Sequence, residues 1–285
     1  MVKECRITSY DGTRIYYTYR RKGLPWLVFL HGGTGNLKGF FNQEEFFLRK
    51  NYSLLFIDLR GHGKSDRGKT KEFFSFKNFA LDVKIVLDTL RIRHAVLVGH
   101  CFGSLIAQEF VSRFPDRVDR LILIDSGFEP FRNRLRKFSA KIFARLISLI
   151  PVEGKKVHPP INRSRNRPDI NPLEAFQNLQ YTGSHTFLYT LSACAEFKCP
   201  VSRFDSPVLL MHGKKDRIIS YRQCYELQKV FPNSRVRIVQ GGHLSLLTIP
   251  EEVNRHISDF LTAASTPSRA GTLVQKAYLS QSSAE

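Results

Sequence analysis

A cysteine set between two glycines is the residue of this chain best suited to chemistry. Cys101 is the centre of a Gly-His-Cys-Phe-Gly run over residues 99–103, between an apolar segment at 94–98 and a helix-like segment at 104–110. A strand that turns sharply into a helix around Gly-x-nucleophile-x-Gly presents one side chain at the helix N-terminus. The helix dipole there favours a thiolate. The motif therefore predicts a sulfur nucleophile at Cys101.

A sulfur nucleophile needs a base, and the base needs a carboxylate that orients it. His243, in a loop after the last expected strand, is the candidate base, and Asp216, after the preceding strand, is the candidate carboxylate. Asp125 also follows a strand and stays open as an alternative carboxylate. Open α/β sheets place their sites at the carboxyl ends of their strands, where all of these residues are expected. The pattern predicts a triad of Cys101, His243 and Asp216.

The sulfur restricts the substrate. Attack by a cysteine on a carbonyl makes a thioester, which is higher in energy than an ordinary oxygen ester, so the expected acyl donor is itself activated: a thioester, an enol or aryl ester, or a lactone. The acyl-enzyme stays reactive toward alcohols, amines and thiols, so acyl transfer is an alternative to hydrolysis. A non-catalytic protein that keeps the pocket for a ligand is the third alternative. No metal or organic cofactor is expected, since the triad needs neither.

Strands and helices must alternate along the chain to position these residues. A hairpin is expected around Asp11-Gly12. The alternation that follows is typical of an α/β fold with a mostly parallel sheet flanked by helices. Apolar runs predict strands at 26–30, 52–57, 94–98, 121–124, 208–212 and 235–239, and helical spacing predicts helices at 76–90, 221–230 and 250–261.

The alternation stops after the sixth strand, and a helical cap is predicted there. A capping side chain, a proline and an acidic residue at 171–174 mark one helix start. An earlier helix carries a basic stripe of Lys137, Lys141 and Arg145. Its apolar face is expected to cover the active site; the alternative is contact with an anionic membrane. That face consists of Phe131, Leu135, Phe138, Ile142, Leu146 and Leu149.

Four segments follow from these boundaries. Residues 1–127 and 201–262 are the two predicted parts of the core, and residues 128–200 are the predicted cap. Residues 263–285 are rich in Ser, Ala and Thr with weak periodicity, so they are predicted to form a flexible tail.

Over most of its length, from about residue 20 to residue 261, the chain resembles the α/β-hydrolase family. The resemblance is closest to the capped branch that holds monoacylglycerol lipases, proline iminopeptidases and small esterases. It is carried by His31-Gly32-Gly33, by Asp-Leu-Arg-Gly-His-Gly-Lys-Ser at 58–65, by the cysteine motif, and by the segments at Asp216 and His243. The resemblance implies an α/β-hydrolase fold and an ester, thioester or lactone hydrolase. Dienelactone hydrolases and polyhydroxyalkanoate synthases also carry cysteine at the motif, but the rest of the chain resembles neither closely.

The same resemblance implies further site residues. The backbone N–H groups of Gly33 and Phe102 are expected to form an oxyanion hole, which stabilises the charge that develops on the carbonyl oxygen of the substrate. The side chains of Phe102 and His31 are candidates for substrate binding. Packing under the cap is the alternative for Phe102, and support of a loop is the alternative for His31, as it is for His62 and His100.

Composition sets the class of protein. The chain has 285 residues, of which 42% are hydrophobic, enough for a large core. Five cysteines without regular spacing argue against a disulfide framework, and Cys194 and Cys199 lack the second pair that a zinc site needs. No signal peptide and no membrane-spanning segment are recognised. A soluble, cytoplasmic protein is expected.

The formal net charge of +19 is high for such an enzyme. A basic surface attracts anionic partners, among them membranes and coenzyme A thioesters; the alternative is a solvated surface without a dedicated partner. The sequence carries none of the common nucleic-acid-binding motifs, so no specific nucleic-acid partner is expected. The expected partner is a small-molecule acyl substrate, with peripheral contact between the basic cap and an anionic membrane as a further option.

Overall fold

The computed structural model describes residues 2–150, 152–160, 163 and 172–263. The predicted capping residue Asn171 and nearly all of the predicted flexible tail lie outside the described residues.

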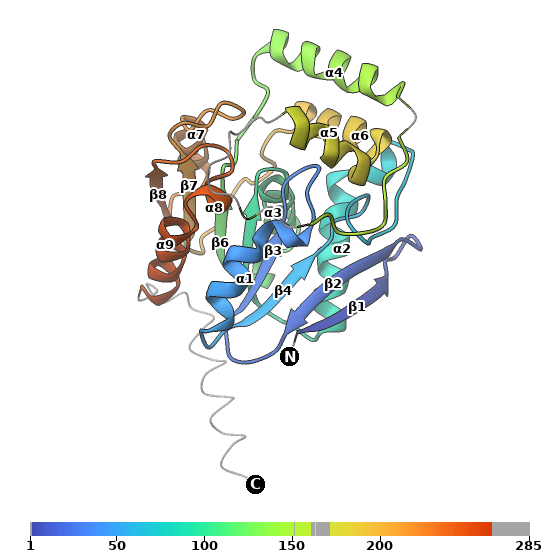
Figure 1. Cartoon of the computed structure of the whole chain (residues 1–285). Coiled ribbons are helices and arrows are strands. Elements are labelled where there is room, and N and C mark those ends of the chain that lie inside the picture. Colours follow the sequence, from blue (N-terminus) through green and yellow to red (C-terminus); the bar gives the residue numbers. More distant parts are fainter. Residues whose placement is uncertain (1, 151, 161–162, 164–171, 264–285) are drawn as a thin grey trace, which may run out of the picture.

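One twisted sheet organises the molecule (Figure 1). Its eight strands follow the order β1-β2-β4-β3-β5-β6-β7-β8. The hairpin of β1 and β2 pairs antiparallel with β4, and the pairs from β4 onward are parallel. The strands are β1 (Lys3–Thr8), β2 (Arg14–Arg20), β3 (Trp26–Leu30), β4 (Ser53–Ile57), β5 (Ala95–His100), β6 (Val118–Ile124), β7 (Val208–Gly213) and β8 (Ser234–Val239).

The central strands are buried along their whole length, as continuous apolar runs in a parallel sheet require. Every residue of β3, β4 and β5 is buried. Helices α2, α3 and α7 cover one face of the sheet, and α1 and α9 cover the other, each over its own apolar cluster. The core helices are α1 (Phe41–Leu48), α2 (Phe76–Thr89), α3 (Phe102–Arg113), α7 (Gln223–Val230), the short α8 (Ser245–Thr248) and α9 (Pro250–Thr262). The predicted α/β architecture is confirmed.

Three helices lie between β6 and β7, where the cap was predicted. They are α4 (Arg134–Ser148), α5 (Pro172–Thr182) and α6 (Ser184–Glu196). In Figure 1 they lie beyond the strand ends that carry the motif loops, with α4 outermost. The exact limits of the cap, at 128 and 200, stay a prediction.

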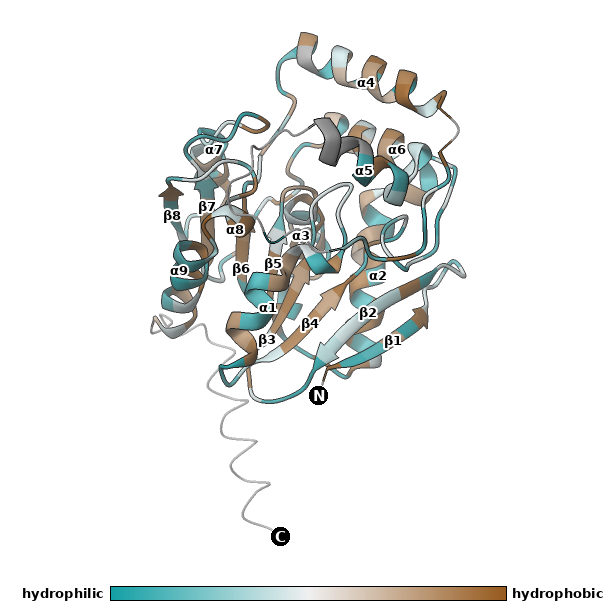
Figure 2. Ribbon diagram, viewed as in Figure 1, coloured by the Kyte–Doolittle hydropathy of each residue, from teal (hydrophilic) through white to brown (hydrophobic). Residues whose placement is uncertain are grey.

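The orientation predicted for α4 is wrong. Its apolar face points away from the protein: Leu135 is 75% exposed, Phe138 62% and Leu146 57%. The opposite side packs on α6, where Ala144 is fully buried. Periodicity identifies the residues that share a face, but it does not tell whether that face meets the core or the solvent. Figure 2 shows the apolar residues of this outermost helix.

No helix within the described part of the chain is long and apolar enough to cross a lipid bilayer.

Candidate active site

The predicted nucleophile occupies a sharp turn between β5 and α3. Cys101 has a positive φ of 49°, a conformation that side chains other than glycine rarely adopt and that stores strain at functional sites. The flanking glycines make this turn sterically feasible. A Cβ at Gly103 would lie 2.0 Å from the carbonyl oxygen of Leu30, and one at Gly99 would lie 2.5 Å from the Cα of Ser104. Cys101 itself is partly exposed.

The structure brings Cys101, His243 and Asp216 together. The Nδ1–H of His243 donates to Oδ2 of Asp216 over 2.7 Å. Cys101 lies close enough to His243 for the charge of its sulfur to act on the imidazole. Because Nδ1 is committed to Asp216, Nε2 is the ring nitrogen left to face the sulfur. This is the arrangement of nucleophile, base and orienting carboxylate used in covalent catalysis.

Electrostatics favour a charged imidazolium in this arrangement. Burial alone would lower the pKa of His243, but the negative charge of Cys101 and the hydrogen bonds with Asp216 and Cys101 raise that pKa well above its usual value. Burial alone would raise the pKa of Asp216, yet the hydrogen bonds from His212 and His243 hold that pKa well below its usual range. The carboxylate is therefore ionised and able to orient a protonated imidazole beside the sulfur.

Asp125, the alternative carboxylate, takes part in a different set of hydrogen bonds. Its Oδ1 accepts from the Gly213 N–H over 2.8 Å, and its Oδ2 accepts from the Ser245 hydroxyl over 2.9 Å. Its nearest histidine contact is His100, at 3.6 Å. The structure therefore places Asp216, and not Asp125, against His243.

A second histidine contacts the triad carboxylate, and the sequence prediction missed it. The Nε2–H of His212 donates to Oδ2 of Asp216 over 3.0 Å and to the carbonyl of Ile219 over 2.9 Å. Burial lowers the pKa of His212, but Asp216 and Cys224 outweigh it and raise the pKa to about 10. His212 is the second-last residue of β7, four residues before Asp216, so its place in the same motif was the available clue.

These groups also form the one cluster of potential metal ligands among the described residues. One ligand atom from each of Asp125, His212 and Asp216 lies within 4.8 Å of the others. The Asp125 oxygens and the His212 Nε2 already take part in the hydrogen bonds described above. Their arrangement is that of a hydrogen-bond network around Asp216.

The loop after β3 lies against the cysteine turn, as an oxyanion hole would require. A Cβ at Gly32 would be 3.5 Å from the Cβ of Cys101, and one at Gly33 would be 3.6 Å from the Cβ of Phe102. The N–H of Phe102 is the first of α3 and has no acceptor within its helix. The Gly33 N–H has no acceptor among the described residues. Both donors are thus free for a substrate oxygen.

A cavity of about 590 Å³ opens beside this loop. His100 and Leu244, the sequence neighbours of Cys101 and His243, form part of its wall together with residues 31–36. On the cap side, residues 177–178 and 180–181 contribute amide and phenol groups. Among the described residues, the wall includes Lys38 and no carboxylate, which suits a neutral or anionic substrate.

The ring of Phe102 does not contribute to this cavity. It is fully buried and packs against Phe76, Phe79 and His62. Packing in the core, the alternative considered for Phe102, is what the structure shows; the prediction that its ring lines an acyl pocket is wrong for this cavity.

His31 lines the cavity but has no ring nitrogen free for a substrate. Its Nδ1–H donates to the carbonyl of Gly32 over 2.8 Å, and its Nε2 accepts from the Leu59 N–H over 3.1 Å. Burial lowers the pKa of His31 to about 4, so the ring is neutral. These bonds favour loop support over the predicted substrate binding. His100 also supports a loop, because its Nε2–H donates to the carbonyl of His243 over 2.9 Å.

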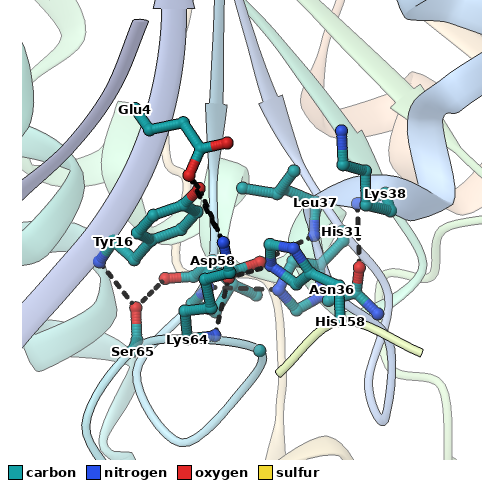
Figure 3. A network of polar contacts seen from close by, with 12 residues as sticks. Glu4, Tyr16, His31, Asn36, Leu37, Lys38, Asp58, Lys64, Ser65 and His158 are labelled. Atoms are coloured by element: carbon teal, nitrogen blue, oxygen red, sulfur yellow. Dashed lines mark hydrogen bonds and ion pairs between the residues drawn. The ribbon is translucent and has the colours of Figure 1, made fainter. Parts of the chain in front are cut away.

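Asp58 connects the loop after β3 to the cap (Figure 3). Its carboxylate accepts from the backbone N–H groups of Leu37 and Lys64, each over 2.8 Å. It also lies 2.6 Å from Nε2 of His158, which belongs to the segment between α4 and α5. Asp58 therefore holds two core loops together, and the cap contact of His158 had no sequence motif to predict it.

The comparisons with known proteins agree with this geometry. Residues 25–148 and 161–250 match the family described as the alpha/beta hydrolase fold, which is more than half of the chain. The chain belongs to this family. The predicted fold class and the predicted enzyme class, a hydrolase, are both confirmed at that level.

Relatives of this α/β-hydrolase include proteins of several kinds. An AB hydrolase superfamily protein, YisY, of Bacillus subtilis is 27% identical over 82% of this chain and 90% of its own. A non-heme chloroperoxidase of Streptomyces lividans is 27% identical over 90% of this chain and 98% of its own. Among solved structures, an esterase from Exiguobacterium antarcticum aligns with a TM-score of 0.77 at 20% identity, over 92% of this chain and all of its own. At that identity the structural likeness supports the fold alone.

Proposed function

We propose that this α/β-hydrolase cleaves an activated acyl substrate through a covalent acyl-enzyme on Cys101. The observation that carries the proposal is the hydrogen bond between Asp216 and His243, with Cys101 close enough to act on the imidazole from the turn where the family places its nucleophile. The free N–H groups of Gly33 and Phe102 beside the sulfur support it further.

The first half of the reaction transfers the acyl group to sulfur. The thiolate of Cys101 attacks the carbonyl carbon, and the negative charge that develops on the carbonyl oxygen meets the N–H groups of Gly33 and Phe102. As the tetrahedral intermediate collapses, the bond to the leaving group breaks and the His243 imidazolium donates its proton to that group. The products are a thioester on Cys101, a neutral His243 and the released alcohol or thiol.

The second half returns the enzyme to its starting state. Neutral His243 takes a proton from water, and the resulting hydroxide attacks the thioester carbonyl. Collapse of this intermediate releases a carboxylic acid and leaves the thiolate beside the imidazolium. An alcohol, amine or thiol in place of water would give acyl transfer with the same residues.

The preferred substrate is a thioester, an aryl or enol ester, or a lactone. Formation of the acyl-enzyme from such donors is nearly level in energy, whereas formation from a plain alkyl ester is uphill. The lack of a carboxylate in the cavity wall and the net charge of +19 are compatible with an anionic donor such as an acyl-coenzyme A.

Intact-mass spectrometry after brief exposure to p-nitrophenyl butyrate and to butyryl-coenzyme A tests the proposal. The wild-type protein should gain one butyryl group, and Cys101→Ala should gain none. His243→Ala should acylate much more slowly, by roughly 10²–10⁴-fold, because general acid–base assistance is lost. An unmodified wild-type protein across a panel of activated esters would favour a non-catalytic ligand-binding protein and overturn the proposal.

The acceptor separates hydrolysis from acyl transfer. Product analysis in the presence of added alcohols and amines should show the free acid as the main product if water is the acceptor. Diversion of most of the product into new esters or amides would assign the protein as an acyltransferase. Faster turnover of a plain alkyl ester than of the thioester would contradict the substrate preference.

We also propose that α4 brings this enzyme to an anionic membrane. Besides Phe143, whose ring contacts Phe187, six apolar side chains on or just after this helix are exposed, and this face points away from the packed side at Ala144. Exposed apolar patches on this scale mark sites of interaction. They are Leu135, Phe138, Ile142, Leu146, Leu149 and Ile150.

The basic residues around the exposed apolar face of α4 indicate which kind of partner this face would bind. Arg132, Arg134 and Arg145 are exposed on or beside α4, and the sequence of α4 contains no Asp or Glu. A second copy of this chain would place one basic face against another, which is repulsive. An interfacial helix with an apolar face and basic flanks instead suits anionic lipid, at about 1 kcal/mol for each basic residue near the surface.

Flotation with vesicles tests this surface. Vesicles of phosphatidylcholine with phosphatidylserine should retain the protein at low salt, and the double variant F138S/L146S should lose most of that binding. Leu24→Ser, which alters a residue 72% exposed elsewhere, is the matched control and should bind normally. Equal binding of the double variant, no binding to anionic vesicles, or a concentration-dependent dimer through α4 would overturn the proposal.

A further inference from the structure

The hydroxyl of Thr190 is buried on the cap helix α6 without a partner. The residue is 3% exposed, and its Oγ1 has no hydrogen-bond partner among the described residues. A hydroxyl buried in this way is less favourable than a paired one, because it has lost water without gaining a protein partner. Groups of this kind in native proteins call for a physical explanation.

Other helical threonines of the chain do not share this feature. Thr89, Thr248 and Thr262 each donate to the carbonyl of the residue four positions earlier, over 2.7 to 3.2 Å. Thr186, one turn before Thr190 on the same helix, donates to the carbonyl of Gly61 over 3.1 Å. The usual ways of satisfying a helical threonine are thus available in this fold. Thr190 uses none of them.

Thr190 lies against the loop that carries an oxyanion donor. Its Cγ2 is 3.0 Å from where a Cβ of Gly33 would be. Cγ2 is the Thr190 atom nearest to Gly33, and the unpartnered hydroxyl is bonded to the same carbon, so it lies within one side chain of this loop. Another four residues along the same face of α6, Cys194 is close enough to Cys101 for the charge of that sulfur to act on it. This face of α6 therefore lies over the catalytic turn.

We propose that the Thr190 hydroxyl donates a hydrogen bond to the substrate oxygen that becomes negative when Cys101 attacks, together with the N–H groups of Gly33 and Phe102. The inference rests on the acyl chemistry proposed for Cys101. The substrate supplies the acceptor that the protein lacks. Because this donor comes from the cap, the oxyanion site is complete only when α6 lies over the loop at Gly33.

Thr190→Val is the decisive variant, since it removes the hydroxyl and keeps the shape. It should lower kcat/KM on the order of 100-fold, the effect typical of losing one oxyanion donor. A trifluoromethyl ketone, which forms a tetrahedral adduct with the sulfur, should bind more weakly by the same factor. Alkylation of Cys101 by iodoacetamide develops no oxyanion, so its rate should not change.

Two further variants separate this role from a structural one. Thr190→Ser keeps the hydroxyl and should retain kcat/KM within about threefold of the wild type. Thr190→Val should have an unchanged or higher Tm, because it removes an unpaired buried hydroxyl. Thr186→Val should instead lower Tm, because it breaks a formed hydrogen bond, while the trifluoromethyl ketone still binds to the folded variant.

The outcomes are distinguishable. Wild-type turnover with an unaffected Thr190→Val variant would overturn the role of Thr190 and leave the proposed function intact. A loss of activity that follows a fall in Tm, or that Thr190→Ser shares, would also overturn it. Absence of any acyl adduct on the wild-type protein would defeat the proposed function itself.

Discussion

At the scale of single residues, Asp216 is the carboxylate on which the electrostatics of the triad depend. It accepts from two histidines through one oxygen, while its other oxygen accepts from the backbone N–H groups of Ile218 and Ile219 over 2.7 and 2.9 Å. The backbone bonds fix the orientation of the carboxylate, and its charge helps to raise the pKa of His243. An uncharged amide would keep the shape and lose the charge.

Asp216→Asn should therefore change the pH profile as well as the rate. Loss of the negative charge lowers the pKa of His243, so the imidazolium that protonates the leaving group is lost at a lower pH. The alkaline limb of kcat/KM should move to lower pH, and kcat should fall by roughly 10²–10⁴-fold. Asp205→Asn, at an exposed pair with Arg203, is the control and should leave the profile unchanged. An alkaline limb that stays in place would contradict the assignment of Asp216.

The two cysteines near the site should differ in reactivity. Burial and the charge of Cys101 raise the pKa of the Cys194 thiol well above its usual value. At neutral pH, iodoacetamide should therefore alkylate Cys101 before Cys194, as peptide mass mapping would show. In Cys101→Ser the charge is gone, so Cys194 should react faster than in the wild type. Earlier labelling of Cys194 in the wild type would contradict this order.

Sequence motifs identified only those site residues that the core contributes. Cys101, Asp216 and His243 follow strands in recognisable loops, so their approach could be predicted from chain order and sheet topology. Thr190 and Cys194 come from the cap, and their contact with the site depends on how α6 packs. That packing is a tertiary contact which no local pattern encodes.

At the scale of elements, the cap depends on a small number of polar contacts. Arg67, in the loop after β4, donates to the carbonyl of Gly61 within its own loop over 2.8 Å. It also donates to the carbonyls of Lys155 and Tyr181 in the cap, each over 2.7 Å. One guanidinium thus links the core loop to two cap segments, which a lysine could not do with the same geometry.

Arg67→Ala should loosen the cap without unfolding the core. The loss of charged hydrogen bonds of this kind costs roughly 1.5–3 kcal/mol. Hydrogen exchange should therefore become faster in α5 and stay slow in β3 and β5, and KM should rise. Arg203→Ala, at a side chain 81% exposed, should change neither quantity. Faster exchange in the central strands would mean that Arg67 stabilises the core instead.

Periodicity predicted elements better than it predicted their surroundings. The parallel strands were predicted from continuous apolar runs, and the helices α2 and α9 were predicted because each has one clear apolar period. The short helix α1 was not, since it has apolar residues on several sides (Phe41, Phe46, Phe47 and Leu48). For α4 the helix was predicted and its orientation was wrong, because an apolar face can pack on lipid as well as on a core.

At the scale of the whole molecule, four of the five buried histidines divide into two pairs with opposite effects on stability. Burial lowers the pKa of His31 to about 4 and that of His62 well below its usual value. For His212 and His243, burial is outweighed by nearby negative groups; the pKa of His212 rises to about 10 and that of His243 well above its usual value. Each histidine has an ordinary pKa of 6.5 in the unfolded chain.

Linkage fixes the sign of each contribution. Between pH 6.5 and about 4, His31 binds a proton in the unfolded chain but not in the folded protein. The free energy of unfolding therefore falls as pH falls through this window. His212 gives the reverse: its contribution is fully present below pH 6.5 and is lost as pH rises toward about 10. The free energy of unfolding should therefore pass through a maximum near pH 6.5.

The two limbs of that maximum can be assigned by substitution. Thermal unfolding followed from pH 4 to pH 10 should show the acid limb weakened in His31→Gln and the alkaline limb weakened in His212→Gln. Each variant should leave the opposite limb as in the wild type, because the two side chains lie at different strand ends, after β3 and at the end of β7. If His212→Gln kept the full alkaline loss of stability, the charge on Asp216 would not be what holds the His212 proton. The support proposed for the Asp216 carboxylate would then have to come from its backbone hydrogen bonds alone.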